Sequence, residues 1–221
     1  MKNFYLLPVI SFSLLSCGSS ENKDSENEKV ASQQKVIEKE TPFSVKTTSS
    51  FDIAKLEKEG TILYSKIWED TNGENIAMFT QVPDKQLFVY HYAIKDNAPK
   101  LLRKVTDFIK DCEFDYGFEF IQSSIAVTDL DKNNLGEVTF AYKITCTSDV
   151  SPWDMKLLTL ENGNKYIIRG TTALSFENET YGGDKTIGES FVNGPKSFLE
   201  NANKIWDASI KELKWRCDKI Y

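Results

Sequence analysis

The chain has 221 residues, with 27 lysines and arginines against 33 aspartates and glutamates, and a formal net charge of −6 at pH 7. This excess of acids argues against nucleic-acid binding, which needs a basic face, and it disfavours direct binding to anionic lipid headgroups. The length suffices for an export signal followed by one domain with a hydrophobic core of its own.

Residues 1–17 predict export and lipid attachment. Lys2 gives a short basic start, and the apolar run over 4–15 is too short to span a bilayer. The run ends in "LLSC", which matches the lipobox of bacterial lipoproteins, where a small residue precedes the cysteine that takes a diacylglycerol. We therefore expect a lipoprotein signal peptide at 1–16 and a mature chain that begins at lipid-bearing Cys17. The alternative is an ordinary cleaved signal peptide with a chance cysteine.

The lipid would hold the protein at the outer membrane, on its periplasmic or its cell-surface side. No other segment of the sequence approaches membrane-spanning length, so we expect this lipid to be the only membrane attachment. Residues 17–42 are polar, charged and free of aromatics, which predicts a disordered tether. The acidic cluster at 21–28 resembles tags that send some lipoproteins to the cell surface, and a plain solvated linker explains it equally well.

Residues 43–221 are expected to form a single globular domain. A serine cap, helix-forming residues and Gly60 as a stop predict a short helix at 51–59. Apolar residues then alternate with polar ones, and Asn72-Gly73 between two such runs is a strong signal for a tight hairpin. The alternation continues through several further runs and a second hairpin signal, "ENGN", which predicts an antiparallel β meander.

The C-terminal part changes to helical spacing. Within "GPKSFLENANKIWDASIKELKWRC" the positions that fall on one helix face are Phe198, Ala202, Ile205, Trp206, Ser209, Ile210 and Leu213. This pattern predicts an amphipathic helix of about five turns that packs on the sheet. The expected fold class is therefore α+β: a sheet-dominated antiparallel β meander with a C-terminal amphipathic helix.

Three cysteines remain once Cys17 carries lipid, so an oxidising compartment predicts one disulfide and one thiol left over. Cys112 and Cys146 are the favoured pair because both lie at the ends of predicted strands. Closing that loop would contribute on the order of 4 kcal/mol in the chain-entropy account. Cys217 is then the unpaired residue. The spacing fits no zinc site, since the sequence has no CxxC and only one histidine.

The stretch "TDLDKNNLGE" has the spacing of a nine-residue calcium loop. Asp129, Asp131 and Asn133 occupy the first, third and fifth positions. Leu135 would offer its carbonyl at the seventh position, and Glu137 falls at the ninth. Calcium takes six to eight oxygen ligands, and alternate residues of a tight turn converge on one point. The sequence therefore predicts a calcium site.

A metal-free polar turn is the competing interpretation, because Asp and Asn favour turns on their own account. The sixth position of such loops usually holds glycine, since the backbone there is left-handed. Here it is Asn134, the next most tolerant residue, and Asn133 in place of an aspartate removes one charge.

Three further residues are candidates for ligand binding. Asp149 and Trp153 lie in the loop "SDVSPWD", where the indole could stack on a sugar ring, although tryptophan is more often buried in a core. Arg169 offers a cation that would pair with Asp149. The single histidine, His91, lies in an alternating strand, which favours a satisfied buried side chain over a general base. A carboxylate pair such as Asp107 and Asp149 stays open as a glycosidase alternative, since spacing does not select such pairs.

Several stretches taken together resemble a known family. "DFIKDCEFD", "TDLDKNNLGEVTFAYK", "SDVSPWDMKLL", "KYIIRGTT" and the tryptophan-bearing terminal helix are similar to bacterial secreted or lipid-anchored proteins labelled surface polysaccharide biosynthesis proteins. The resemblance covers about residues 60–215. It implies a disulfide between Cys112 and Cys146, which fall on the two cysteines of the family. In the loop of that family, glycine usually stands where this chain has Asn134. The resemblance supplies no catalytic residues.

The leading hypothesis is a lipid-anchored accessory protein that binds or helps assemble surface polysaccharide, with calcium as the one expected cofactor. The alternative is a glycan-modifying enzyme that uses carboxylates on the loops near Asp129 and Asp149. A third hypothesis is a structural partner of an outer-membrane complex that contacts other envelope proteins through its terminal helix.

Overall fold

The computed structural model describes residues 41–213, apart from 84–85 and 177–178. The predictions for the signal peptide, for lipid-bearing Cys17, for most of the tether and for Cys217 lie outside these ranges. None of the helices within them is long and apolar enough to cross a membrane.

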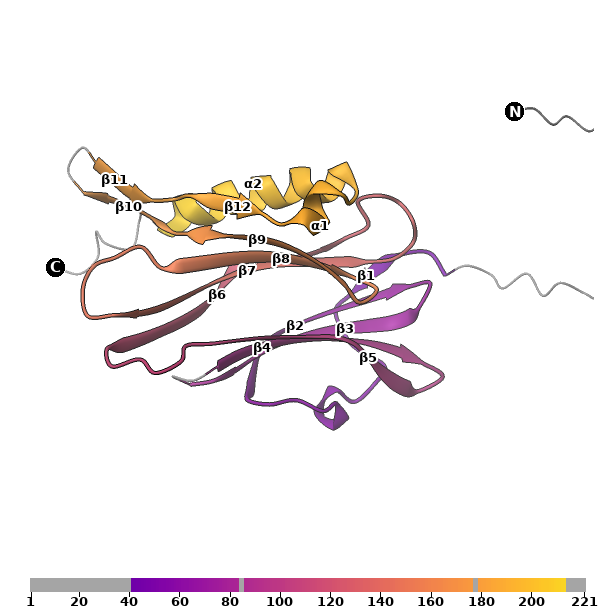
Figure 1. Cartoon of the computed structure of the whole chain (residues 1–221). Helices are drawn as coiled ribbons and strands as arrows, with labels where there is room; N and C mark the ends of the chain where they lie inside the picture. The colour runs from indigo at the N-terminus through magenta and orange to yellow at the C-terminus, as the bar shows by residue number, and fades with distance from the viewer. Residues whose placement is uncertain (1–40, 84–85, 177–178, 214–221) are drawn as a thin grey trace, which may run out of the picture. The chain divides into compact units, whose positions relative to one another are not determined.

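Two antiparallel five-stranded sheets make up most of the described chain (Figure 1). The first sheet runs in sequence order: β1 (Ser44–Lys46), β2 (Thr61–Asp70), β3 (Gly73–Val82), β4 (Gln86–Lys95) and β5 (Ala98–Phe108). The second has the order β12-β9-β8-β7-β6: β12 (Lys185–Ile187), β9 (Asn164–Thr171), β8 (Asp154–Glu161), β7 (Glu137–Thr147) and β6 (Asp115–Thr128). A hairpin of β10 (Ala173–Phe176) and β11 (Glu179–Gly182) leads into β12. The expected α+β class and the antiparallel meander are confirmed.

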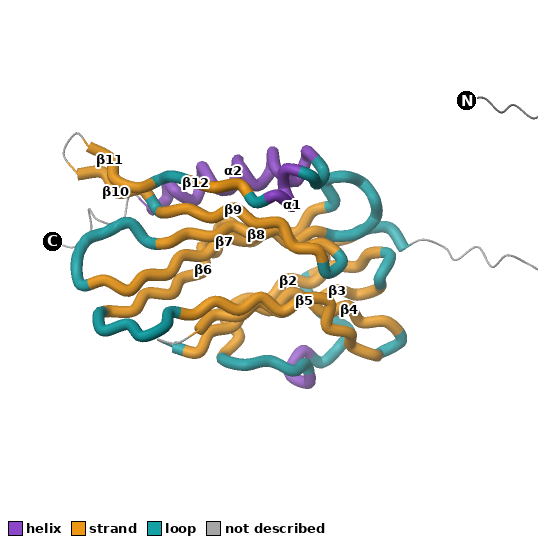
Figure 2. The backbone as a smooth tube through the Cα atoms, viewed as in Figure 1, coloured by secondary structure: helices purple, strands orange, loops and turns teal. Residues whose placement is uncertain are grey.

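The helices cover one face of the second sheet (Figure 2). They are α1 (Glu189–Val192) and α2 (Lys196–Leu213), and α2 has the five turns that the sequence predicts. On its apolar face, Phe198, Ala202 and Trp206 are buried against the sheet. The described part of the domain therefore has three layers: first sheet, second sheet, helices.

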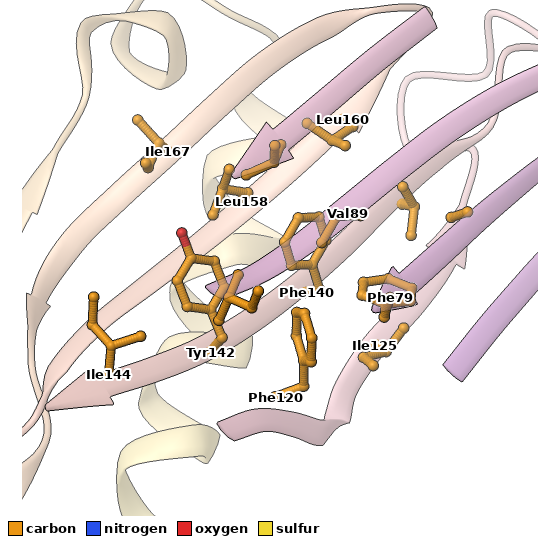
Figure 3. Packing of buried hydrophobic residues seen from close by; sticks show 14 of the residues in the cluster. Phe79, Val89, Phe120, Ile125, Phe140, Tyr142, Ile144, Leu158, Leu160 and Ile167 are labelled. Carbon is orange, nitrogen blue, oxygen red and sulfur yellow. The ribbon is translucent and has the colours of Figure 1, made fainter. Parts of the chain in front are cut away.

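The main core lies between the two sheets (Figure 3). Phe79 and Val89 from the first sheet meet Phe120, Phe140 and Leu158 from the second in one buried cluster. The neighbours of these residues in the second sheet, among them Ile121, Ala141 and Leu157, belong to a separate cluster under the helices. Burial of both faces explains why strands of this sheet carry adjacent apolar pairs as well as alternation.

Tight turns fix the register of the hairpins. Asn162 and Gly163 join β8 to β9 with φ values of 43° and 82°, and Asp96 and Asn97 join β4 to β5 with 53° and 59°. Two consecutive left-handed residues are typical of the turn whose twist matches that of paired strands. The predicted hairpin at Asn72-Gly73 also forms, between β2 and β3.

The helix expected at 51–59 is wrong: the structure has a single 3-10 turn, η1 (Ile53–Lys55). Side chains of the first sheet bind the backbone that such a helix would use. The hydroxyl of Tyr92 donates to Glu57 O, and the hydroxyl of Tyr90 accepts from Glu59 N. These bonds satisfy the backbone groups and hold the segment flat on the sheet.

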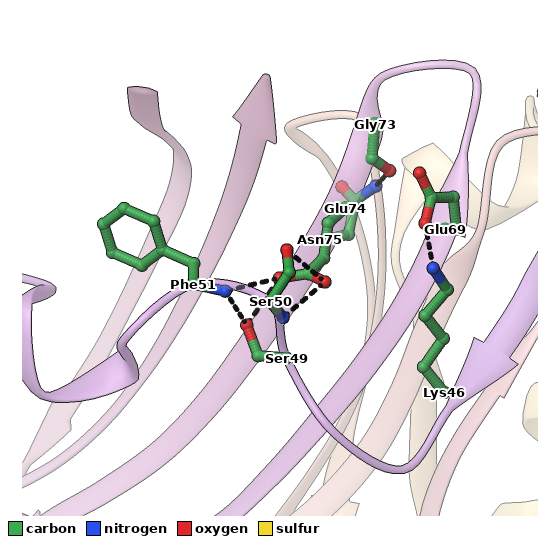
Figure 4. Close-up of polar contacts among 8 residues, drawn as sticks. All are labelled: Lys46, Ser49, Ser50, Phe51, Glu69, Gly73, Glu74 and Asn75. Atoms are coloured by element: carbon green, nitrogen blue, oxygen red, sulfur yellow. Dashed lines mark hydrogen bonds and ion pairs between the residues drawn. The ribbon is translucent and has the colours of Figure 1, made fainter. Parts of the chain in front are cut away.

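Glu74 fixes the start of the same segment (Figure 4). Its carboxylate accepts the backbone N–H groups of Ser50 and Phe51 and the hydroxyls of Ser49 and Ser50. These bonds hold 49–51 against β3, and the buried Leu56 follows on the outer face of the sheet.

The disulfide Cys112–Cys146 is confirmed, with 5.8 Å between the two Cα atoms. It joins the β5–β6 loop to the last residues of β7, and so ties a connection between the two sheets to the second sheet. The 34-residue separation corresponds to about 4 kcal/mol of loop-closure stabilisation in the chain-entropy account.

Candidate metal centre

Three carboxylates converge in the loop between β6 and β7. One oxygen each from Asp129, Asp131 and Glu137 lies within 4.8 Å of the others. Two oxygens bound to one calcium ion at 2.3–2.6 Å can be at most about 5 Å apart, so this spacing suits a shared cation. The structure therefore brings together the three predicted ligands that carry charge.

Glu137 is the innermost member of the cluster. Its residue is fully buried at the start of β7, and its carboxylate accepts from Leu130 N at 3.0 Å and from the Thr128 hydroxyl at 3.1 Å. Burial raises the pKa of the Glu137 carboxyl to about 7, with a further contribution from the charge of Asp131. This carboxylate is thus held where its negative charge is costly unless a proton or a cation accompanies it.

The loop has the left-handed residue that the pattern requires. Asn134 has φ 60°, as expected for the sixth position, and Lys132 also has φ 60°. The two oxygens of Asp129 accept the backbone N–H groups of Asn133 at 3.1 Å and of Asn134 at 3.3 Å. Side-chain bonds to nearby backbone amides therefore shape the turn.

Asn133 does not present its oxygen to the cluster. Its Oδ1 accepts from Leu135 N at 2.7 Å, while its Nδ2 donates to Asp131 at 3.2 Å and to Glu161 at 2.7 Å. Its predicted role as an oxygen ligand would require the amide to turn over. Leu135 lies in the loop as predicted, held by this bond to Asn133.

Glu161 and Asp70 also lie at this end, and the sequence pattern did not reveal either of them. Glu161 is the last residue of β8 and pairs directly with Glu137 across the ladder. Burial raises the pKa of Glu161, and the charges of Asp131, Asp129 and Asp70 raise it further. No lysine or arginine in the described ranges forms an ion pair with any of these five carboxylates.

Asp70 holds the loop against the first sheet. It is 2% exposed, and its Oδ2 accepts from Trp68 Nε1 and from Gly136 N, both at 2.9 Å. Next to it, the backbone N–H and the hydroxyl of Thr71 both donate to Asn134 O. A Cβ on Gly136 would lie 2.2 Å from Trp68 Nε1, so only glycine allows this approach. In the sequence, the only available signal for Asp70 was an acid two residues before the Asn72-Gly73 turn.

The remaining ligand candidates do not form one site. Asp149 is exposed and accepts from Thr147 and Ser151 of its own loop, and these hydrogen bonds lower the pKa of its carboxyl. Arg169 lies on β9 opposite Lys156. In the part of the chain that the structure describes, no ion pair joins Asp149 to Arg169, so that predicted pairing is wrong.

Trp153 packs onto the second sheet. The ammonium of Lys143 lies 4.6 Å from the centre of its ring, and its outer edge lies close to Gly117. Lys143 is itself 9% exposed and paired with Glu119 at 3.1 Å. The indole therefore covers a nearly buried cation, which is a structural use of this side chain.

The carboxylates proposed for catalysis lie apart or are engaged. Asp129 precedes β7 and Asp149 follows it, and a strand of this length spans about 35 Å. Asp107 accepts from the Tyr142 hydroxyl at 2.8 Å and is paired with Lys156. No single active site can combine Asp129 with Asp149.

His91 is buried between the sheets, as its strand pattern predicts, but its Nδ1 has no hydrogen-bond partner in the described part of the chain, so the expected satisfied side chain is only partly confirmed. It is 1% exposed, its Nε2 lies 3.0 Å from Asn75 Oδ1, and its ring centre lies 5.0 Å from that of Trp68. Burial lowers the pKa of His91 to about 4. The side chain is therefore a neutral part of the core at neutral pH.

No protein-family model, curated protein or solved structure matches the chain. The family resemblance of its motifs thus stays a prediction.

We predict that His91 makes the fold less stable as the pH falls. The unfolded chain binds a proton near pH 6.5 and the folded chain only near pH 4, so stability is lost between these values. The loss should approach about 3 kcal/mol, at about 1.4 kcal/mol per pH unit. Urea unfolding of wild type and His91→Gln, from pH 7 to pH 4 in the presence of a chelator, measures this loss. It is the difference in how steeply the free energies of unfolding of the two proteins fall with pH.

The raised pKa values of Glu137 and Glu161 change stability with pH in the opposite direction. Both glutamates are present in wild type and in His91→Gln, so the difference between the two proteins isolates the effect of His91. The single histidine also permits a direct check by NMR, since its ring signals should not titrate above pH 5. Titration near pH 6.5 in the folded protein would contradict the account.

Proposed function

We propose that the chain is a lipid-anchored accessory protein of surface polysaccharide biosynthesis, which binds polysaccharide and carries a structural calcium ion. The observation that carries the calcium part is the convergence of Asp129, Asp131 and Glu137. The envelope location rests on the lipobox at Cys17, and the polysaccharide role rests on the family resemblance of the motifs.

Calcium suits the donor set better than softer metals do. The three side chains offer only carboxylate oxygens, which hard cations prefer. A divalent ion would offset the repulsion among carboxylates that the fold places together, including the direct Glu137–Glu161 pair. Because the loop is bonded to Asp70 and Thr71 of the first sheet, an ion here would also stabilise the junction of the two sheets.

A binding role is favoured over the two alternatives by where the candidate groups lie. The carboxylate loops named for an enzyme are at opposite ends of β7, and Asp107 is occupied by Lys156 and Tyr142. Phe198, Ala202 and Trp206 of α2 are buried against the second sheet, so these residues offer no surface to an envelope partner.

We predict that the full chain, purified in detergent, binds calcium with saturation. At a free concentration of 100 times the Kd, binding should stabilise the fold by about 2.7 kcal/mol. Asp131→Asn should weaken binding at least tenfold, because it removes a charged ligand from an exposed position. Calorimetric titration gives the affinity, and thermal unfolding gives the stabilisation.

Asp111→Asn is the matched control, since Asp111 is another exposed acid but lies in the β5–β6 loop. It should leave calcium affinity unchanged. Magnesium, which prefers to keep its water shell, should stabilise less. Absence of a calcium-dependent shift, or equal affinity in Asp131→Asn, would make the loop a metal-free turn.

We further predict that the same full chain binds surface polysaccharide extracted from the cells that produce it, and leaves it unaltered. Titration calorimetry should give saturable heat, and an assay of reducing ends and acyl groups should show no change after prolonged incubation. New reducing ends or released acyl groups would favour the enzyme. The absence of binding heat would contradict the polysaccharide role.

A further inference from the structure

The end of the second sheet opposite the acidic loop carries exposed aromatic side chains around the disulfide. Phe114 is 56% exposed and Tyr116 is 43% exposed. Tyr116 pairs with Cys146 across β6 and β7, and its hydroxyl donates to Cys112 O at 3.0 Å. Phe114 is held close to the same bridge, since its carbonyl lies 3.4 Å from Cys112 Sγ. The backbone of both aromatic residues therefore lies next to a covalent cross-link.

A pocket of about 380 Å³ adjoins this bridge. It is lined by Ile109, Ile144, Thr145, Cys146, Thr147, Ser151, Pro152 and Asp154. Cys146 belongs both to the disulfide and to the pocket wall, and Tyr116 pairs with Cys146 across β6 and β7, so the pocket and the two aromatics lie on either side of the same bridge without the aromatics lining the pocket. Phe114, Tyr116 and the pocket are called here the disulfide face.

The lining of the pocket is mixed rather than apolar. Hydroxyls of Thr147 and Ser151 and the carboxylate of Asp154 stand beside Ile109 and Ile144. Two residues further inward along the strands, Asp107, Tyr142 and Lys156 bond to one another. The inner groups thus bond to one another. At the pocket, the Thr147 and Ser151 hydroxyls donate to Asp149 but can still accept hydrogen bonds, and Asp154 adds a carboxylate.

Charge selects among the classes of ligand that such a face could take. The connections that form it carry acids at positions 111, 113, 115, 149 and 154, against a single lysine at 110. Such a surface repels anionic sugars, phosphates and anionic lipid headgroups. A neutral sugar fits it, because it presents C–H faces to aromatic rings and hydroxyl groups to carboxylates and hydroxyls.

We propose that the disulfide face binds neutral sugar units of the polysaccharide, with Phe114 and Tyr116 as stacking platforms and the pocket as the hydrogen-bonding subsite. This inference rests on the proposed function, and it assigns polysaccharide binding to the end remote from the calcium loop. Because Tyr116 pairs with the disulfide-bonded Cys146, its place in the sheet is fixed before binding, which reduces the side-chain entropy that the protein loses when a sugar binds.

The test is calorimetric titration of the full chain in detergent with the extracted surface polysaccharide, comparing single variants. Phe114→Ala and Tyr116→Ala should each weaken binding at least tenfold. Tyr116→Phe keeps the ring and loses only the hydroxyl, and it should bind within threefold of wild type. Leu101→Ala removes an equally exposed apolar side chain from β5 and should leave binding unchanged.

Thermal unfolding of each variant separates a lost contact from a lost fold, and a variant whose midpoint falls is replaced by Phe114→Leu or Tyr116→Leu. If wild type binds and the two alanine variants bind equally well, the assignment of sugar binding to the disulfide face is wrong, while the proposed function stands. If wild type does not bind, both are overturned. Saturable heat with polylysine, and none with the polysaccharide, would assign the face to a basic protein partner and overturn the sugar proposal.

Discussion

The buried carboxylate of Asp70 connects the two sheets at their acidic end. It accepts the indole N–H of Trp68 from its own sheet and the backbone N–H of Gly136, which leads into the other sheet. Burying this carboxylate without hydrogen-bond donors would cost free energy. It accepts a third hydrogen bond from Asn72 N, and the three bonds together fix the position of the turn. The position of the loop that contains Asp129, Asp131 and Glu137 follows from this contact.

Strand β7 links the two functional ends that we propose. It begins at Glu137 in the carboxylate cluster and ends beside Cys146 at the disulfide face. Between them its side chains alternate between the inter-sheet core and the cluster under the helices, so the strand is held on both faces. This arrangement allows an ion at one end to stabilise the junction of the sheets while the other end stays available for a ligand. It also explains why carboxylates on the two loops cannot serve one reaction.

The sequence predicted those features that depend on local pattern, and missed those that depend on register. Alternation, the hairpins at Asn72-Gly73 and Asn162-Gly163, and the terminal helix follow from spacing of nearby residues. The prediction of a helix at 51–59 failed because Tyr90 and Tyr92, more than thirty residues away, form hydrogen bonds with the backbone of this segment. In the same way, Asp129 and Asp131 were found from loop spacing, whereas Glu161 joins them only because β7 and β8 pair Glu137 with it. The arrangement of the strands in two layers could not be predicted either, because alternation of apolar and polar residues does not show which strands share a sheet.

The most direct test of the account is the free energy of unfolding of Asp70→Asn beside wild type, measured with urea in chelator at pH 7. An asparagine keeps the shape but offers one oxygen and an amide group to three donors, two of which are buried. The account predicts a loss of about 1–3 kcal/mol, because a buried donor is left without an acceptor. Unchanged stability would contradict the claim that Asp70 fixes the acidic loop to the first sheet.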